Sequence, residues 1–84
     1  MESYFDLRMA RENLGDTFLR KLYEKTVNNG TETIDMYEIG KEIGLLDKTQ
    51  TYNLVNELIY EGYIRKSDGS KIYLSDKGRK RVEI

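Results

Sequence analysis

Residues 47–62, DKTQTYNLVNELIYEG, decide the fold of this chain. Asp47 is a favourable helix N-cap, and Gln50 three residues later makes a capping box with it. A stripe of side chains recurs at three- and four-residue steps and would be buried: Thr51, Leu54, Val55, Leu58 and Ile59. Gly62 can then stop the helix. The stretch therefore predicts an amphipathic helix over residues 47–61.

The opposite face of this helix carries hydrogen-bonding side chains, mostly in its N-terminal half. They are Lys48, Thr49, Gln50, Tyr52, Asn53 and Asn56. A helix that buries one side and offers donors and acceptors on the other suits the major groove of DNA. Such side chains are also common on helix surfaces without a binding role, and that alternative stays open.

Two helices and a short strand are predicted before residue 47. The first helix, starting near Asp16, is defined by Leu14, Phe18, Leu19, Leu22, Thr26 and Val27 at the helical period. Residues 28–30, Asn-Asn-Gly, end it. Residues 31–34 favour a strand, and Asp35 can cap a helix over residues 36–43. The inner face of that second helix would carry Met36, Ile39 and Ile43.

Gly40 is unusual inside the second helix, because glycine there costs about 1 kcal/mol relative to alanine. We expect another backbone to approach it closely. Gly44 then ends the helix, and the short turn to Asp47 makes the two helices pack across each other and on the first helix.

After Gly62 the pattern changes to alternation. Residues 63–67 and 71–75 are predicted strands on either side of an Asp68-Gly69 turn, which is a strong hairpin signal. Ile64, Ile72 and Leu74 would face the core, and Arg65, Lys71 and Tyr73 would face outward. Ser75 or Asp76 can cap a last helix through Val82. The order helix, strand, helix, helix, strand, strand, helix predicts an α+β domain.

Composition narrows the chemistry of the chain. The 84 residues, enough for one domain, include no cysteine and no histidine, so disulfides, thiol or imidazole catalysis and the usual zinc sites are not expected. No apolar run reaches the roughly 18 residues that span a bilayer, and the N-terminus lacks the basic start and apolar core of a signal peptide. We expect a cytoplasmic protein without metal or cofactor and without membrane association.

The charge of the chain is unevenly distributed. The net charge of −1 argues against a nonspecific nucleic-acid binder. However, residues 1–46 hold six basic and nine acidic side chains, whereas residues 47–84 hold eight and six. Residues 63–82 alone hold seven basic and two acidic side chains. A charge run is often only a solvated face, but this one directly follows the helix with the polar face.

Three segments are similar to a known family. They are Asp35-x-x-Glu38-Ile39-Gly40-x-x-Ile43-Gly44-Leu45, Leu54-Val55-x-x-Leu58-x-x-x-Gly62-Tyr63-Ile64-Arg65, and Leu74-Ser75-x-x-Gly78-Arg79. In this order, with a hairpin between the last two, they resemble the winged helix-turn-helix family, in particular MarR-type and related archaeal and bacterial transcription regulators. The resemblance covers residues 16–82. It implies a three-helix core, a β-hairpin wing, a short C-terminal helix and sequence-selective binding of double-stranded DNA.

The resemblance also implies roles for individual residues. The helix over residues 47–61 would lie in the major groove, and the hairpin over residues 63–75 would touch the flanking backbone. Thr49, Gln50 and Asn53 match family positions that face bases and phosphates, with Lys48 and Tyr52 beside them. Arg65 matches the basic residue after the helix, and Lys66 and Lys71 sit on the wing. With Asn56 on the same helix face, these make up the predicted DNA-binding residues.

The sequence departs from the family at several points. Asn53 replaces a common arginine, which predicts weaker affinity for DNA. Gly40 stands where alanine is usual, and the turn over residues 44–47 is one residue longer than usual. The sequence stops about two turns into the last helix, where MarR-type proteins continue into a dimerisation helix, so the family's dimer is not implied.

Two other functional classes compete with DNA binding. A protein-interaction module is favoured by Glu57 and Glu61 on the predicted reading helix, by Asp68 in the hairpin turn and by seven tyrosines. An enzyme is not expected, because Glu38 and Glu42 share a face with Lys41 and no nucleophile–base pair is evident.

We expect two regions in the chain. Residues 1–15 form an N-terminal segment that is partly helical or loose, and residues 16–84 form the domain. Phe5, Met9 and Leu14 are the best candidates for a dimer contact, so the chain is predicted to form a homodimer through its N-terminal segment.

Overall fold

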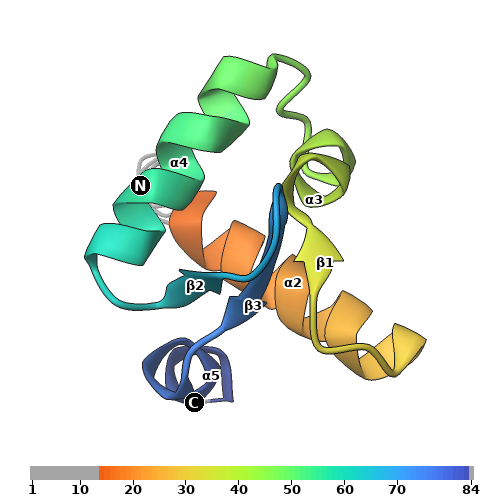
Figure 1. Ribbon diagram of the computed structural model, residues 1–84, viewed down its shortest axis with the longest axis vertical. Coiled ribbons are helices and arrows are strands. Elements are labelled where there is room, and N and C mark those ends of the chain that lie inside the picture. Colours follow the sequence, from red (N-terminus) through yellow and green to blue (C-terminus); the bar gives the residue numbers. More distant parts are fainter. Residues whose placement is uncertain (1–13, 84) are drawn as a thin grey trace, which may run out of the picture.

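The structure, a computed structural model, describes residues 14–83, which form four helices and a three-stranded antiparallel sheet (Figure 1). The elements are α2 (Leu14–Asn29), β1 (Ile34–Asp35), α3 (Met36–Glu42), α4 (Lys48–Tyr60), β2 (Ile64–Lys66), β3 (Lys71–Leu74) and α5 (Asp76–Glu83). The predicted α+β class and the order of elements are confirmed. The predicted N-terminal dimer contact at Phe5 and Met9 lies outside the described residues.

The core lies where α2, α3 and α4 pack against one face of the sheet. Its buried apolar side chains are Phe18, Leu19, Leu22, Ile34, Met36, Ile39, Val55, Leu58, Ile64 and Ile72. The predicted stripe of the first helix is wrong at its two ends, since Leu14 is 41% exposed and Val27 is 61% exposed. Val27 lies near the C-terminal end of α2, which extends beyond the other elements (Figure 1), and Leu14 is the first residue of that helix.

Both helices of the α3–α4 pair begin at an aspartate N-cap, as predicted. The Tyr37 amide donates to Asp35 Oδ1, and the Thr49 amide donates to Asp47 Oδ1, each at 2.9 Å. The N-cap at Asp47 is therefore present, but the predicted capping box is not formed, because the Gln50 backbone amide donates to the Asp47 carbonyl instead of to its side chain. These bonds satisfy amides that no helix carbonyl can reach.

The predicted close approach at Gly40 exists, but a side chain makes it. A Cβ atom on Gly40 would collide with Thr51 Oγ1 and would stand 3.1 Å from Thr51 Cβ. The helix α4 thus crosses α3 at the one position where α3 carries no side chain.

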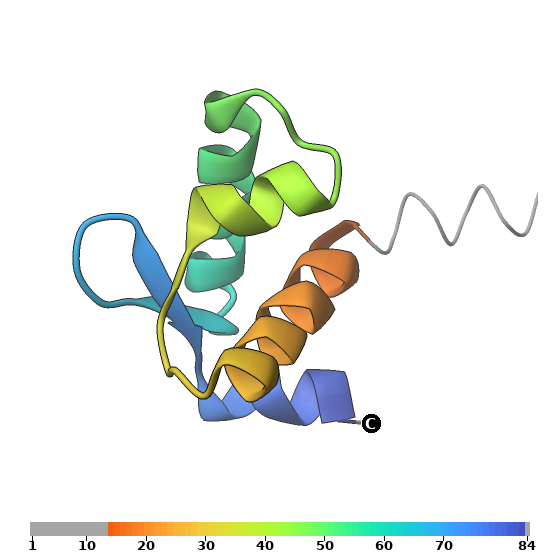
Figure 2. The ribbon, with the colours of Figure 1, turned by 90° about the vertical axis from the view of Figure 1, so that its right-hand side faces the viewer.

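The sheet has the strand order β1–β3–β2. Its first strand is only Ile34–Asp35, so the predicted strand over residues 31–34 is wrong in its first three residues. The hairpin strands are also shorter than predicted. The Met36 amide donates to the Ser70 carbonyl at 2.9 Å and so ties the hairpin loop to the start of α3. Figure 2 shows this loop projecting beyond the helices.

Helix α5 closes the fold from below the sheet in Figure 1. Ser75 caps it, since the Gly78 amide donates to Ser75 Oγ at 3.1 Å. Gly78 is buried against the Tyr63 carbonyl, with which a Cβ would collide. The Arg81 side chain donates to Asp16 of α2 at 2.7 Å. Among residues 14–83, no helix combines the length and apolar character needed to cross a membrane.

Candidate nucleic-acid interface

Helix α4 presents an uncharged stripe on the side opposite the core. Thr51, Val55 and Leu58 are buried, so residues half a turn away from them face solvent. Thr49, Asn53, Asn56 and Tyr60 follow one another at steps of four, three and four residues and are all exposed. The stripe therefore offers hydroxyl and amide groups along the whole helix and no charge.

The remaining α4 residues predicted to bind DNA flank this stripe on its two sides. Tyr52 is 46% exposed, and the ammonium of Lys48 lies 5.3 Å from the centroid of the Tyr37 ring on α3. Gln50 is on the other flank, where it borders a hollow of about 310 Å³ with Leu14 and Leu54. All six predicted α4 residues are exposed, but they do not point in one direction.

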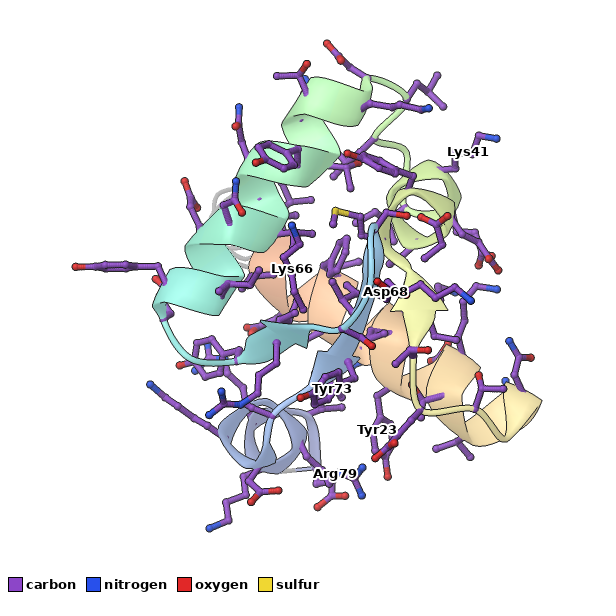
Figure 3. The ribbon with its side chains drawn as sticks, viewed as in Figure 1. Tyr23, Lys41, Lys66, Asp68, Tyr73 and Arg79 are labelled. Atoms are coloured by element: carbon purple, nitrogen blue, oxygen red, sulfur yellow. The ribbon has the colours of Figure 1, made fainter. Side chains whose placement is uncertain are left out.

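The three predicted hairpin residues lie on two different faces of the sheet. Lys66 pairs with Ile72, and Arg65 pairs with Tyr73. Side chains of directly opposed residues share a face, and neighbours along a strand alternate. Lys66 is therefore on the face of the buried Ile64 and Ile72, and it projects from the hairpin toward α4 (Figure 3). Arg65 and Lys71 are on the outer face.

This arrangement brings together the polar stripe of α4 and one cation of the hairpin. No family model, curated protein or solved structure matches this chain. The geometry and electrostatics of the site therefore carry the functional argument alone.

The cations predicted to bind DNA differ from those that hold the fold together. Lys25 contacts Glu42 and Glu38, and its hydrogen bonds, first with Glu42 and then with Glu38, raise the pKa of Lys25 above the ordinary value. Arg81 is bound to Asp16, which raises the pKa of the guanidinium. A second group of cations has no such partner: no carboxylate within residues 14–83 lies within 4.0 Å of their side-chain nitrogens. These cations are Lys48, Arg65, Lys66 and Lys71.

Tyr60 is the exposed residue of the stripe that the sequence analysis did not select. It is 92% exposed, more than any other large apolar or aromatic side chain of the described residues. Its spacing of four residues from Asn56 would have placed it on the outward stripe. Asp68, which favoured an interaction module, lies in the hairpin loop near Lys66 (Figure 3). The described residues contain no cluster of three carboxylates that could hold a metal ion.

Proposed function

We propose that this chain is a winged helix-turn-helix domain that binds double-stranded DNA sequence-selectively, as a small transcription regulator. In the proposed complex, α4 enters the major groove and the hairpin β2–β3 lies on the flanking backbone. The observation that carries the proposal is the exposed, uncharged stripe of α4, on which Thr49, Asn53 and Asn56 offer hydrogen-bonding groups. Lys66 of the hairpin is directed toward the same helix.

The chemistry of these side chains matches the needs of base recognition. Asn53 and Gln50 can each form two hydrogen bonds with an adenine edge, and one such pair discriminates between bases by about 1–3 kcal/mol. Lys48 and Lys66 can displace counterions from phosphates, which supplies affinity without sequence information.

Selection of bound duplexes from a random pool tests the proposal. We expect Asn53→Ala and Gln50→Ala to recover motifs that have lost defined positions of the parent motif. Asn28→Ala is the matched control, since Asn28 is an exposed asparagine on α2 away from α4. Recovery of the parent motif by both α4 variants would exclude these residues as readers of the sequence.

A protein-interaction module is the second candidate. It is favoured by three large side chains that are exposed to solvent. The exposed fraction is 92% for Tyr60, 82% for Leu46 and 46% for Tyr52. The affinity for duplex DNA of random sequence, measured at a series of salt concentrations, distinguishes the two functions. Two phosphate contacts, those of Lys48 and Lys66, give a logarithmic slope of about −2, and absence of binding at low salt would favour the interaction module.

A further inference from the structure

A small hollow opens between α2, β3 and α5, away from the α4 stripe. Its volume is about 190 Å³. Tyr23 of α2, Tyr73 of β3 and Arg79 of α5 line it together (Figure 3). The two tyrosines are half-buried and Arg79 is exposed. Two aromatic side chains and one guanidinium therefore meet here, one from α2 and two from the consecutive elements β3 and α5.

Arg79 differs from Arg81 on the same helix. Arg81 donates two hydrogen bonds to Asp16, at 2.7 and 3.3 Å. No carboxylate of residues 14–83 lies within 4.0 Å of the Arg79 side-chain nitrogens. The hydroxyl of Tyr23 lies 3.4 Å from Glu83 Oε2, which is long for a hydrogen bond between oxygens. The donors of Arg79 thus remain available to a ligand, whereas the Tyr23 hydroxyl donates this long bond to Glu83.

Positive charge continues from the hollow along the outer face of the sheet. Arg65 lies directly across from Tyr73, so the two side chains share that face. Carboxylates interrupt the positive surface, because Glu32 lines the hollow, Glu83 lies beside the Tyr23 hydroxyl and Asp35 lies across from Lys71. A continuous phosphate backbone would meet these acids, whereas a chain with separated carboxylates can avoid them.

The size of the hollow also indicates its occupant. Pockets for drug-sized ligands measure about 300–1,000 Å³, and this one is smaller. It accommodates one side chain of a larger partner. Tyrosine and arginine are among the residues that most often dominate the binding energy of protein interfaces.

We propose that the surface formed by Tyr23, Tyr73 and Arg79, with Arg65 beside it, binds an acidic peptide segment of a partner protein. One carboxylate of the segment binds Arg79 through two parallel hydrogen bonds, as arginine and carboxylate commonly do. A neighbouring apolar side chain of the segment lies between the two tyrosine rings. Because this surface does not include the α4 stripe, it goes beyond the proposed DNA binding and does not depend on it.

Nuclear magnetic resonance of the isotope-labelled full chain tests this proposal. The probe is a short amidated peptide in which glutamate alternates with phenylalanine, and the control peptide carries glutamine in place of glutamate. We expect the probe to shift the amides of Tyr73 and Arg79 most. Arg79→Gln should weaken binding by about tenfold or more, as the loss of a charge-assisted pair does. Lys80→Gln, which removes the same charge from an exposed position of α5, should change it by less than about twofold.

Three outcomes would overturn the proposal. Equal weakening by Arg79→Gln and Lys80→Gln would mean that the peptide responds only to net charge. Equal binding of the glutamine peptide would exclude carboxylate recognition. Displacement of the probe by duplex or single-stranded DNA, with Arg79→Gln weakening that DNA as much as the peptide, would identify a nucleic-acid surface instead.

Discussion

At Gly40 of α3, the side chain of Thr51 of α4 packs so closely that the position has room only for the hydrogen atom of glycine. A Cβ on Gly40 would collide with Thr51 Oγ1 and stand 3.0 Å from Thr51 Cγ2. Thr51 is 1% exposed, and its hydroxyl has no hydrogen-bond partner in the described part of the chain. Packing against Gly40, and not a polar contact, therefore accounts for the position of this side chain.

We predict that Gly40→Ala lowers the free energy of unfolding by about 1–3 kcal/mol, as overpacking does, although alanine favours the helix. Thr51→Ala removes the atoms that collide, so the double variant should lose less than the sum of the two single variants. Urea unfolding of the four proteins measures this coupling, which should exceed about 0.5 kcal/mol. Additive losses would show that Thr51 is not the reason for glycine at position 40.

The residue-scale features that sequence analysis predicted are the local ones. Asp35 and Asp47 were found because an N-cap bonds an amide two or three residues away. The partner of Gly40 was not identified as a side chain, because it depends on how α4 crosses α3. The exposure of Leu14 and Val27 also depends on where neighbouring elements end, and no periodicity contains that information.

Helix α5 is held to the sheet by a contact with a backbone atom. Gly78 is buried, and a Cβ there would collide with the Tyr63 carbonyl and stand 3.0 Å from Leu74 Cδ2. The same carbonyl accepts a hydrogen bond from the Ser75 amide at 3.1 Å, so it cannot move without a further loss. We predict that Gly78→Ala lowers the free energy of unfolding by about 2–3 kcal/mol.

Lys80→Ala is the control for this prediction, because Lys80 is exposed on the same helix. It should change the free energy of unfolding by less than about 0.5 kcal/mol. Equal effects of the two variants in thermal or urea unfolding would contradict close docking of α5 at Gly78.

Lys25 links α2 to α3 through two carboxylates, and this link has a pH dependence of known sign. The side chains of Glu42 and then Glu38 raise the pKa of Lys25 above its ordinary value of 10.5. The folded state thus holds this proton more tightly than the unfolded state. The stabilisation is complete below pH 10.5 and is lost as the pH rises through the folded-state pKa.

We therefore expect the difference in unfolding free energy between the parent and Lys25→Gln to shrink as the pH rises above 10.5. Urea unfolding at a series of alkaline pH values measures it. Lys21→Gln serves as control, since Lys21 pairs only with Glu24 of its own helix, at 3.6 Å, among the described residues. A difference that stays constant across the series would show that the α2–α3 link does not depend on the charge of Lys25.

At the scale of the whole molecule, sequence analysis predicted part of the candidate site. The exposure of Asn53 and Asn56 follows from the helical period, because the opposite stripe is apolar. The separation of Lys66 from Arg65 requires the register of the hairpin relative to the core. The meeting of Tyr73 and Arg79 with α2 requires the complete fold.

The two faces of the hairpin give the DNA proposal a sharp test. Lys66 projects toward α4, whereas Lys71 shares the outer face with Tyr73. If α4 lies in the major groove, the backbone beside it meets the inner face of the hairpin. We predict that Lys66→Gln weakens binding to duplex DNA of every sequence. The slope of log affinity against log salt concentration should become less negative by about one, because one phosphate contact is lost.

Lys71→Gln removes the same charge from the same hairpin and should leave that slope unchanged. Fluorescence anisotropy of a labelled duplex over a range of salt concentrations measures both variants against the parent. A larger loss of slope in Lys71→Gln than in Lys66→Gln would mean that the backbone runs along the outer face of the sheet. DNA could not then lie in contact with the stripe of Thr49, Asn53 and Asn56, and the proposed arrangement of α4 and hairpin on the duplex would be wrong.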